Sequence, residues 1–228
     1  MKYGQFCPIA KASEVLGERW MLLVLRELVS GATRYAELQR GLGRISPSVL
    51  SSRLKTLIDH NIIERIPAEG GNGWAYQLTA SGTELTPIIE SIGVWGQRWT
   101  RSRMSADELD VELLMLHVQR NFDASAFDKD HGVVAVVFSD LHGESRRWWL
   151  LVDGEDVELC VQPPGRPEDV TLSCRLKTLT EVFMGDCTFR EALGEGRLEV
   201  KGPGKLTRSL GKWLLPSALS AVPEARAS

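Results

Sequence analysis

Apolar residues recur at helical spacing in the first part of the chain. The first apolar stripe follows the spacing i, i+3, i+4 and i+8 and consists of Trp20, Leu23, Val24 and Leu28. It predicts an amphipathic helix that ends near Gly31, because glycine commonly follows the last turn of a helix. Thr33 is placed to cap a short second helix that buries Tyr35 and Leu38. Two consecutive helices are therefore expected here.

A third helix is predicted to begin at Ser46 and Pro47. Serine is a favoured N-cap, and proline is tolerated in the first helical turn. One side of this helix is apolar and carries Leu50, Leu54, Leu57 and Ile58. Another side has the same helical spacing and carries Ser48, Ser51, Ser52 and Lys55. The exposed face is thus expected to be rich in hydroxyls and basic, with the single acid Asp59 near its end.

The apolar period then changes from helical to alternating. Residues 62–66 and 74–78 alternate in the manner of strands, and the sequence EGGNG between them supplies glycines for a turn. This pattern predicts a β-hairpin. A further helix is expected from near Thr79 to Trp99, with Pro87 either bending it or moving its true start to a later residue.

The second half of the chain has a different pattern and a different charge. A helix is expected over 107–122, followed by short strands, two helical pieces, a strand at 197–202 and a last helix near 206–215. Residues 1–104 contain 13 Lys and Arg against 9 Asp and Glu, whereas residues 105–228 contain 14 against 21. We therefore predict a basic, mainly α domain over 1–104 and an acidic α+β domain over 105–228.

Several classes of function find no support in the sequence. The four cysteines lack CxxC spacing, the four histidines are scattered, and no nucleophile, nucleotide-binding or Rossmann motif is present. No apolar stretch has the length of a membrane span or of a signal peptide. We expect a soluble, cytoplasmic protein without catalytic activity, metal or cofactor.

The order helix, short helix, turn, helix, hairpin is that of a winged helix-turn-helix, which suits double-stranded DNA. The third helix fits the major groove, where short polar side chains reach base edges and cations contact phosphates. The base-edge candidates are Ser48, Ser51, Ser52 and Lys55, and the N-cap Ser46 is a further candidate DNA contact. Arg44 and Arg53 are the candidate phosphate partners. Taken alone, the same helix face is more typical of an ordinary solvated surface, because serine-rich faces are common.

Three segments make the interpretation more specific. The segments CPIAKASEVLGERWMLLVLRELVSGATRYAELQR, ISPSVLSSRLKTL and YQLTASG together resemble the HxlR family of MarR-like regulators over residues 7–99. The resemblance implies a homodimer formed by the first and last helices of the domain, with Ile88, Ile92, Trp95 and Trp99 as dimer surface. Family members often have a basic residue and a glutamine where this chain has Ser48 and Ser52, and their wings often carry arginine.

Cys7 lies in the CPI segment, through which some HxlR relatives sense oxidants or electrophiles. A thiol near the start of a helix is favoured as the reactive thiolate. The resemblance therefore implies a redox response through Cys7. The alternative is that Cys7 is a small apolar residue that packs against its neighbours.

The segment DVTLSCRLKTLTEVFMGDCTFREALGEGRLEVKG resembles the sterol-carrier-protein-like domain, within a wider match over residues 109–215. This resemblance implies helices over one face of a mainly antiparallel sheet and an apolar small-molecule effector. Nine residues are expected to line such a site: Val134, Val136, Phe138, Trp148, Leu150, Leu172, Leu179, Phe183 and Leu198. Two alternatives are that these residues close a solid core, and that the domain only dimerises or recruits a partner.

Overall fold

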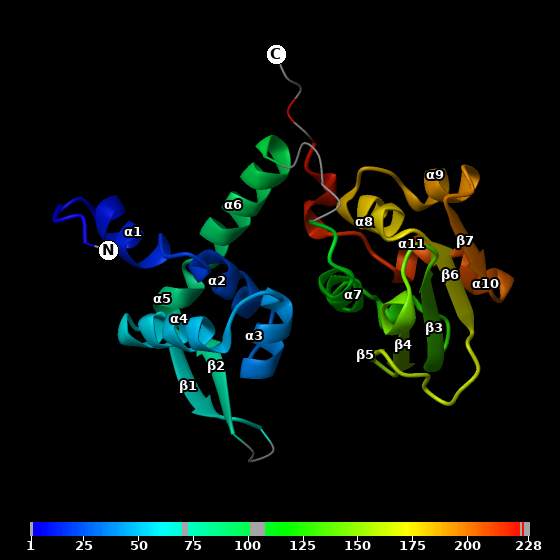
Figure 1. Ribbon diagram of the computed structural model, residues 1–228, viewed down its shortest axis with the longest axis horizontal. Helices are drawn as coiled ribbons and strands as arrows, with labels where there is room; N and C mark the ends of the chain where they lie inside the picture. Colours follow the sequence, from blue (N-terminus) through cyan, green and yellow to red (C-terminus); the bar gives the residue numbers. More distant parts are fainter. Residues whose placement is uncertain (1, 70–72, 101–107, 224, 226–228) are drawn as a thin grey trace. The chain divides into compact units, whose positions relative to one another are not determined.

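A computed structural model describes residues 2–69, 73–100, 108–223 and 225 (Figure 1). The chain divides into two compact units, Met1–Trp95 and Gly96–Ser228. The predicted domain boundary between residues 104 and 105 lies outside the described residues, as do Gly70, Gly71 and Asn72 of the predicted hairpin turn.

The first unit is a helical domain with one β-hairpin. Its helices are α1 (Pro8–Leu16), α2 (Met21–Val29), α3 (Tyr35–Leu42), α4 (Pro47–Asp59), α5 (Ala80–Thr83) and α6 (Thr86–Trp99), the last of which ends in the second unit. Its strands are β1 (Ile63–Pro67) and β2 (Trp74–Leu78), which pair antiparallel. The core is formed by the inward faces of α2, α3 and α4 together with Ile63. This order is that of a winged helix-turn-helix, as predicted.

Two residues of the predicted apolar stripe of the first long helix, Val24 and Leu28, are buried as predicted, but Trp20 and Leu23 are not. Trp20 has a φ of 78°, outside the right-handed helical region, so α2 begins at Met21. Leu23 is 41% exposed. The buried face consists instead of Met21, Val24, Leu25, Glu27 and Leu28. Spacing alone does not distinguish the two stripes, because the left-handed residue that sets the start of the helix has no local sequence signal.

The start of α3 also differs from the prediction. Thr33 is not the cap, because the helix begins at Tyr35 and Arg34 precedes it. The carboxylate of Glu37 accepts hydrogen bonds from the backbone N–H groups of Thr33 and Arg34, both at 2.9 Å. The same segment joins the wing, since the Tyr76 N–H donates to the Thr33 carbonyl at 2.8 Å. The short helix is thereby attached to the hairpin.

The second unit is an α+β domain built on one five-stranded sheet of order β5-β4-β3-β6-β7. The strands are β3 (His131–Phe138), β4 (Arg147–Asp153), β5 (Asp156–Cys160), β6 (Val170–Cys174) and β7 (Leu198–Lys201). All neighbours pair antiparallel except β3 and β6, which are parallel. The helices are α7 (Val111–Arg120), α8 (Leu176–Met184), α9 (Phe189–Gly194), α10 (Gly204–Arg208) and α11 (Leu210–Trp213). Short 3-10 turns occupy Ala124–Ala126, Gly143–Arg146 and Ala218–Ala221.

The two faces of the sheet are covered differently. Side chains alternate across a strand, so the even-numbered residues of β3 face one way and pack with α7, α8 and α11 in one large core. The opposite face has a small cluster of Val133, Ala135 and Trp149. There the Trp149 indole donates to the carboxylate of Glu168, from the β5–β6 connection, at 2.8 Å. The expected arrangement of helices over one face of a mainly antiparallel sheet is confirmed.

Candidate nucleic-acid interface

Helix α4 has one fully apolar side and one polar side. Leu50, Leu54 and Leu57 are buried in the core of the first unit. Ile58, which was expected on the same side, is 37% exposed. The polar side consists of four exposed residues at helical spacing: Ser48, Ser51, Ser52 and Lys55. The structure therefore places these four predicted residues together on one surface.

Two side chains fix the beginning of α4. The Ser46 hydroxyl accepts a hydrogen bond from the Val49 N–H at 3.4 Å, which is the predicted cap. The Tyr35 hydroxyl donates to the Pro47 carbonyl at 2.9 Å and lies 3.4 Å from the Ser51 Oγ. Tyr35 was predicted only as a buried residue, but it also ties the start of α3 to the start of α4. Ser46 thus stabilises the first turn of α4 through the hydrogen bond between its hydroxyl and the Val49 backbone.

The two predicted phosphate partners lie in different surroundings. Arg44 is exposed in the turn between α3 and α4. Arg53 is largely covered, because its Nε donates to the Arg19 carbonyl at 2.8 Å and its guanidinium lies 2.5 Å from the Glu18 carboxylate. Arg53 therefore joins α4 to the α1–α2 connection. A phosphate contact by Arg53 stays a prediction and requires this ion pair to open.

The wing carries a cation that sequence reasoning missed. The Arg65 guanidinium lies 4.0 Å from the ring centroid of Trp74, which is half exposed. Arg65 pairs with Tyr76 in the hairpin, so Trp74 is its diagonal neighbour across the two strands. The Arg34 guanidinium also donates to the Glu69 carbonyl at 3.0 Å. The hairpin register is the signal that would have identified the Arg65–Trp74 pair.

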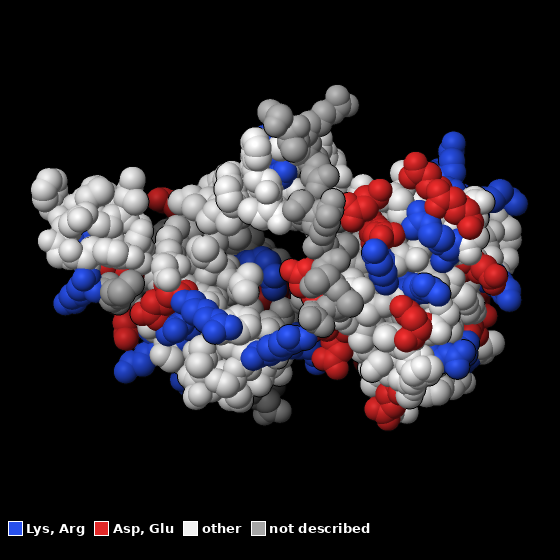
Figure 2. Space-filling model, turned by 45° about the horizontal axis from the view of Figure 1, so that its top comes forward, with Lys and Arg blue, Asp and Glu red and all other residues white. Residues whose placement is uncertain are grey.

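Apolar side chains remain exposed on α6 and near the N-terminus. Ile88, Ile92, Trp95 and Trp99 follow one another at helical spacing, with exposed fractions from 43% to 61%. A groove of about 430 Å³ lies along the same side of the helix, next to Ser91. Phe6 and Ile9 are also exposed. Figure 2 shows few charged side chains over α6.

The four cysteines differ in burial. Cys7 is half buried and immediately precedes α1, and its carbonyl accepts the Lys11 N–H at 3.0 Å. Burial raises the pKa of the Cys174 thiol to about 12 and also raises the pKa values of the Cys160 and Cys187 thiols. These three thiols are therefore disfavoured as thiolates at neutral pH.

The nine residues predicted to line an apolar site all lie in the core of the second unit. None is more than 8% exposed, and together they form part of one continuous packed cluster. A ligand among them would have to displace existing van der Waals contacts.

Within the described part of the chain, no helix has the length and apolar character needed to cross a bilayer. The described residues also contain no group of three or more His, Cys, Asp or Glu side chains that could hold a metal ion.

Two known families match two separate parts of the chain. Residues 15–104 match the HxlR-like helix-turn-helix model, and residues 116–214 match the SCP-2 sterol transfer family. YvaP of Bacillus subtilis, an HTH-type transcriptional regulator, is 34% identical over 101 residues, which are 43% of this chain and 94% of YvaP. Rv3095 of Mycobacterium tuberculosis, also an HTH-type regulator, is 37% identical over 92 residues, which are 40% of this chain and 58% of Rv3095.

Among solved structures, the reduced form of the regulator YodB from B. subtilis aligns with a TM-score of 0.38 and 27% identity. The alignment covers 44% of this chain and 100% of YodB. The fold and the sequence matches define a transcriptional regulator with an N-terminal winged helix and a C-terminal SCP2 domain. The chain belongs to the HxlR-like helix-turn-helix family.

Proposed function

We propose that the protein binds double-stranded DNA as a homodimer, with one α4 helix in the major groove of each half-site. The observation that carries the proposal is the exposed face of α4, where three serine hydroxyls and the Lys55 ammonium project away from buried leucines. Such a face offers donors and acceptors to base edges. Tyr35 supports this role, because it holds the beginning of α4 in place.

The homodimer is supported by the exposed apolar side of α6. Side chains as large as Trp95 and Trp99 are seldom left in water over several successive turns unless a partner covers them. A second copy of the same chain presents the same face. Two copies related by a two-fold axis would therefore pack their α6 surfaces against each other. Two α4 helices would then read two half-sites of one operator.

The Lys55→Ala variant is expected to bind operator DNA less tightly by about 1–3 kcal/mol, because it removes a cation from the α4 face. Ser52→Ala should also weaken binding if the hydroxyl contacts a base edge. Fluorescence anisotropy with the native upstream duplex measures both effects. Lys212→Ala is the matched control, since Lys212 is an exposed lysine on α11. Unchanged affinity in both α4 variants would place the reading surface on another part of the domain.

We also propose that the SCP2 domain responds to an apolar small-molecule effector and thereby changes operator affinity. The match to the SCP-2 sterol transfer family supports an apolar effector. An effector can change operator affinity only by as much as its own affinity differs between the DNA-binding and the non-binding state of the regulator. The alternative is a purely structural domain, which the filled core favours.

A thermal-shift screen with lipids, sterols and aromatic acids distinguishes the two roles of the SCP2 domain. A bound effector is expected to raise the melting temperature, because it binds only the folded state. Phe183→Ala should remove that shift, since Phe183 belongs to the predicted apolar site. The absence of stabilisation by every compound would leave the structural role.

A redox response through Cys7 is a second candidate. It is supported by the position of Cys7 before α1 and by the raised pKa values of the other three thiols. Peroxide or quinone is expected to change operator binding, and Cys7→Ser to abolish the change. A response that persists in Cys7→Ser would leave Cys7 as a packing residue.

A further inference from the structure

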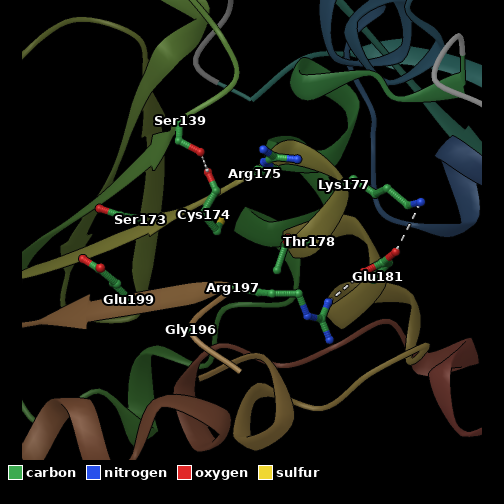
Figure 3. A pocket seen from close by; sticks show the side chains of 10 residues that line it. All are labelled: Ser139, Ser173, Cys174, Arg175, Lys177, Thr178, Glu181, Gly196, Arg197 and Glu199. Carbon is green, nitrogen blue, oxygen red and sulfur yellow. Dashed lines mark hydrogen bonds and ion pairs between the residues drawn. The ribbon is translucent and has the colours of Figure 1, made fainter. Parts of the chain in front are cut away.

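A polar pocket of about 610 Å³ lies at the end of the sheet in the second unit, where β6 leads into α8 and β7 begins (Figure 3). Its volume is in the range of small-molecule sites. None of the nine predicted apolar residues lines it. The pocket is therefore distinct from the predicted apolar site, although it borders the core at Cys174, and it offers different chemistry to a ligand.

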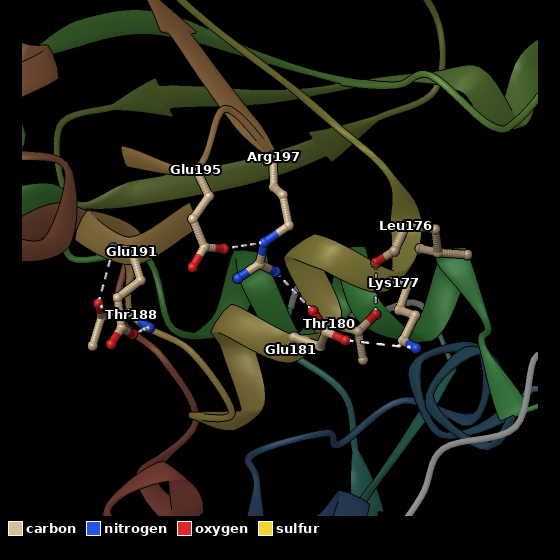
Figure 4. A network of polar contacts seen from close by, with 8 residues as sticks. All are labelled: Leu176, Lys177, Thr180, Glu181, Thr188, Glu191, Glu195 and Arg197. Atoms are coloured by element: carbon tan, nitrogen blue, oxygen red, sulfur yellow. Dashed lines mark hydrogen bonds and ion pairs between the residues drawn. The ribbon is translucent and has the colours of Figure 1, made fainter. Parts of the chain in front are cut away.

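The three cations that line this pocket differ in how strongly they are paired with carboxylates. Arg197 is held by two carboxylates, Glu195 at 2.6 Å and Glu181 at 2.9 Å (Figure 4). The Lys177 ammonium lies 3.7 Å from Glu181 and is mostly exposed. Arg175 is exposed and has no ion-pair partner among the described residues. The Arg175 guanidinium is thus available to a ligand at the pocket. The Lys177 ammonium is also available, because its contact with Glu181 is long and leaves donors free.

A threonine hydroxyl also lines the pocket. Thr178 is only 5% exposed, and its hydroxyl has no hydrogen-bond partner among the described residues. Figure 3 shows its side chain directed between Cys174 and Arg197. The hydroxyl is open to the pocket, so it can donate a hydrogen bond to a ligand or accept one from it.

The carboxylates restrict which ligand fits. The Glu181 carboxylate already pairs with two cations, Lys177 and Arg197. Glu199 is exposed, and its one ion pair among the described residues is long, at 4.0 Å from Lys201. Glu199 would repel a second negative group but accept hydrogen bonds from ligand hydroxyls. The lining therefore suits a molecule with one oxyanion group and a neutral, hydroxyl-bearing remainder.

We propose that this pocket binds a small hydroxylated oxyanion. Arg175 and Lys177 bind its carboxylate or phosphate, because a guanidinium forms paired hydrogen bonds with either group. Thr178 and Glu199 bind the hydroxylated part. The proposal does not rest on DNA binding, so the site is tested with the anion alone.

Isothermal titration calorimetry of the full chain with gluconate and with glucose 6-phosphate tests the proposal, and glucose is the neutral control. At least one of the two anions is expected to bind with a Kd below about 10 mM, and glucose should not bind. Gluconate binding identifies a carboxylate site, and glucose 6-phosphate binding identifies a phosphate site. If neither anion binds, or if glucose binds as well as they do, the proposal is overturned.

Two variants test the assigned contacts. Arg175→Gln is expected to raise the Kd at least about tenfold, because it removes the unpaired cation. Thr178→Val should also raise it without unfolding the domain, since the shape of the side chain is kept. Arg166→Gln is the matched control, because Arg166 is an exposed arginine of the same unit that does not line the pocket. Equal binding by wild type and Arg175→Gln would refute the site.

Discussion

The Gly41→Ala variant is expected to lose at least about 2 kcal/mol of unfolding free energy, because its methyl group would overlap a buried carboxylate. A Cβ on Gly41 would lie 1.8 Å from Oε2 of Glu27, whose side chain is fully buried. The carboxylate is held in place by two hydrogen bonds from Arg26, at 2.7 and 3.1 Å. The same guanidinium donates to the Gly41 carbonyl at 3.0 Å. The substitution thus disrupts the contact that joins α2 to α3.

Urea unfolding of the full chain measures this loss, and a double-mutant cycle identifies its cause. Glu27→Ala removes the overlapping atoms, so the double variant should lose less stability than the sum of the two single losses. Gly194→Ala is the matched control, since no atom lies within 4 Å of a Cβ at that position. Strictly additive losses, or an unchanged unfolding midpoint in Gly41→Ala, would be inconsistent with the proposed contact.

Ile92→Glu and Trp95→Glu are each expected to convert the dimer into a monomer and to weaken operator binding by at least about 100-fold. The carboxylate would be buried without a partner in the proposed apolar interface. A monomer also loses the second half-site and its phosphate contacts. Light scattering after size-exclusion chromatography gives the molecular mass, and anisotropy gives the DNA affinity of the same preparation.

The control for this experiment is Leu193→Glu, which introduces the same charge at an exposed leucine on α9. It should leave both the mass and the DNA affinity unchanged. A wild-type chain that is monomeric at micromolar concentration, or α6 variants that remain dimeric, would require another explanation for the exposed face of α6.

Local signals in the sequence predicted most of the elements of the first unit. Ser46 and Pro47 identified the start of α4, because capping depends on neighbouring residues only. The contact between Glu27 and Gly41 had no such signal, since it joins two helices across fourteen positions. For the same reason the sequence identified Arg53 as a cation but not its pairing with Glu18.

In the second unit, alternation predicted the strands but not the nature of the site. Residues such as Val136 and Leu172 were predicted to face inward, and they do so. Alternation does not distinguish a core from a cavity, because both require apolar side chains on the covered face. The polar pocket was missed because Arg175, Thr178 and Glu199 come together only when β6, α8 and β7 are assembled.

The salt dependence of operator binding tests the central claim most directly. Full-length protein is titrated into the native upstream duplex at several salt concentrations, and log K is plotted against log salt. If Arg44 of each protomer contacts a phosphate, and the Lys55 ammonium contacts one in addition to a base edge, a dimer releases about four counterions and the slope should be steeper than about −3. Lys55→Ala should make that slope shallower by about 2. Binding that is insensitive to salt, or no binding by the intact dimer, would contradict the assignment of α4 as a DNA-reading helix.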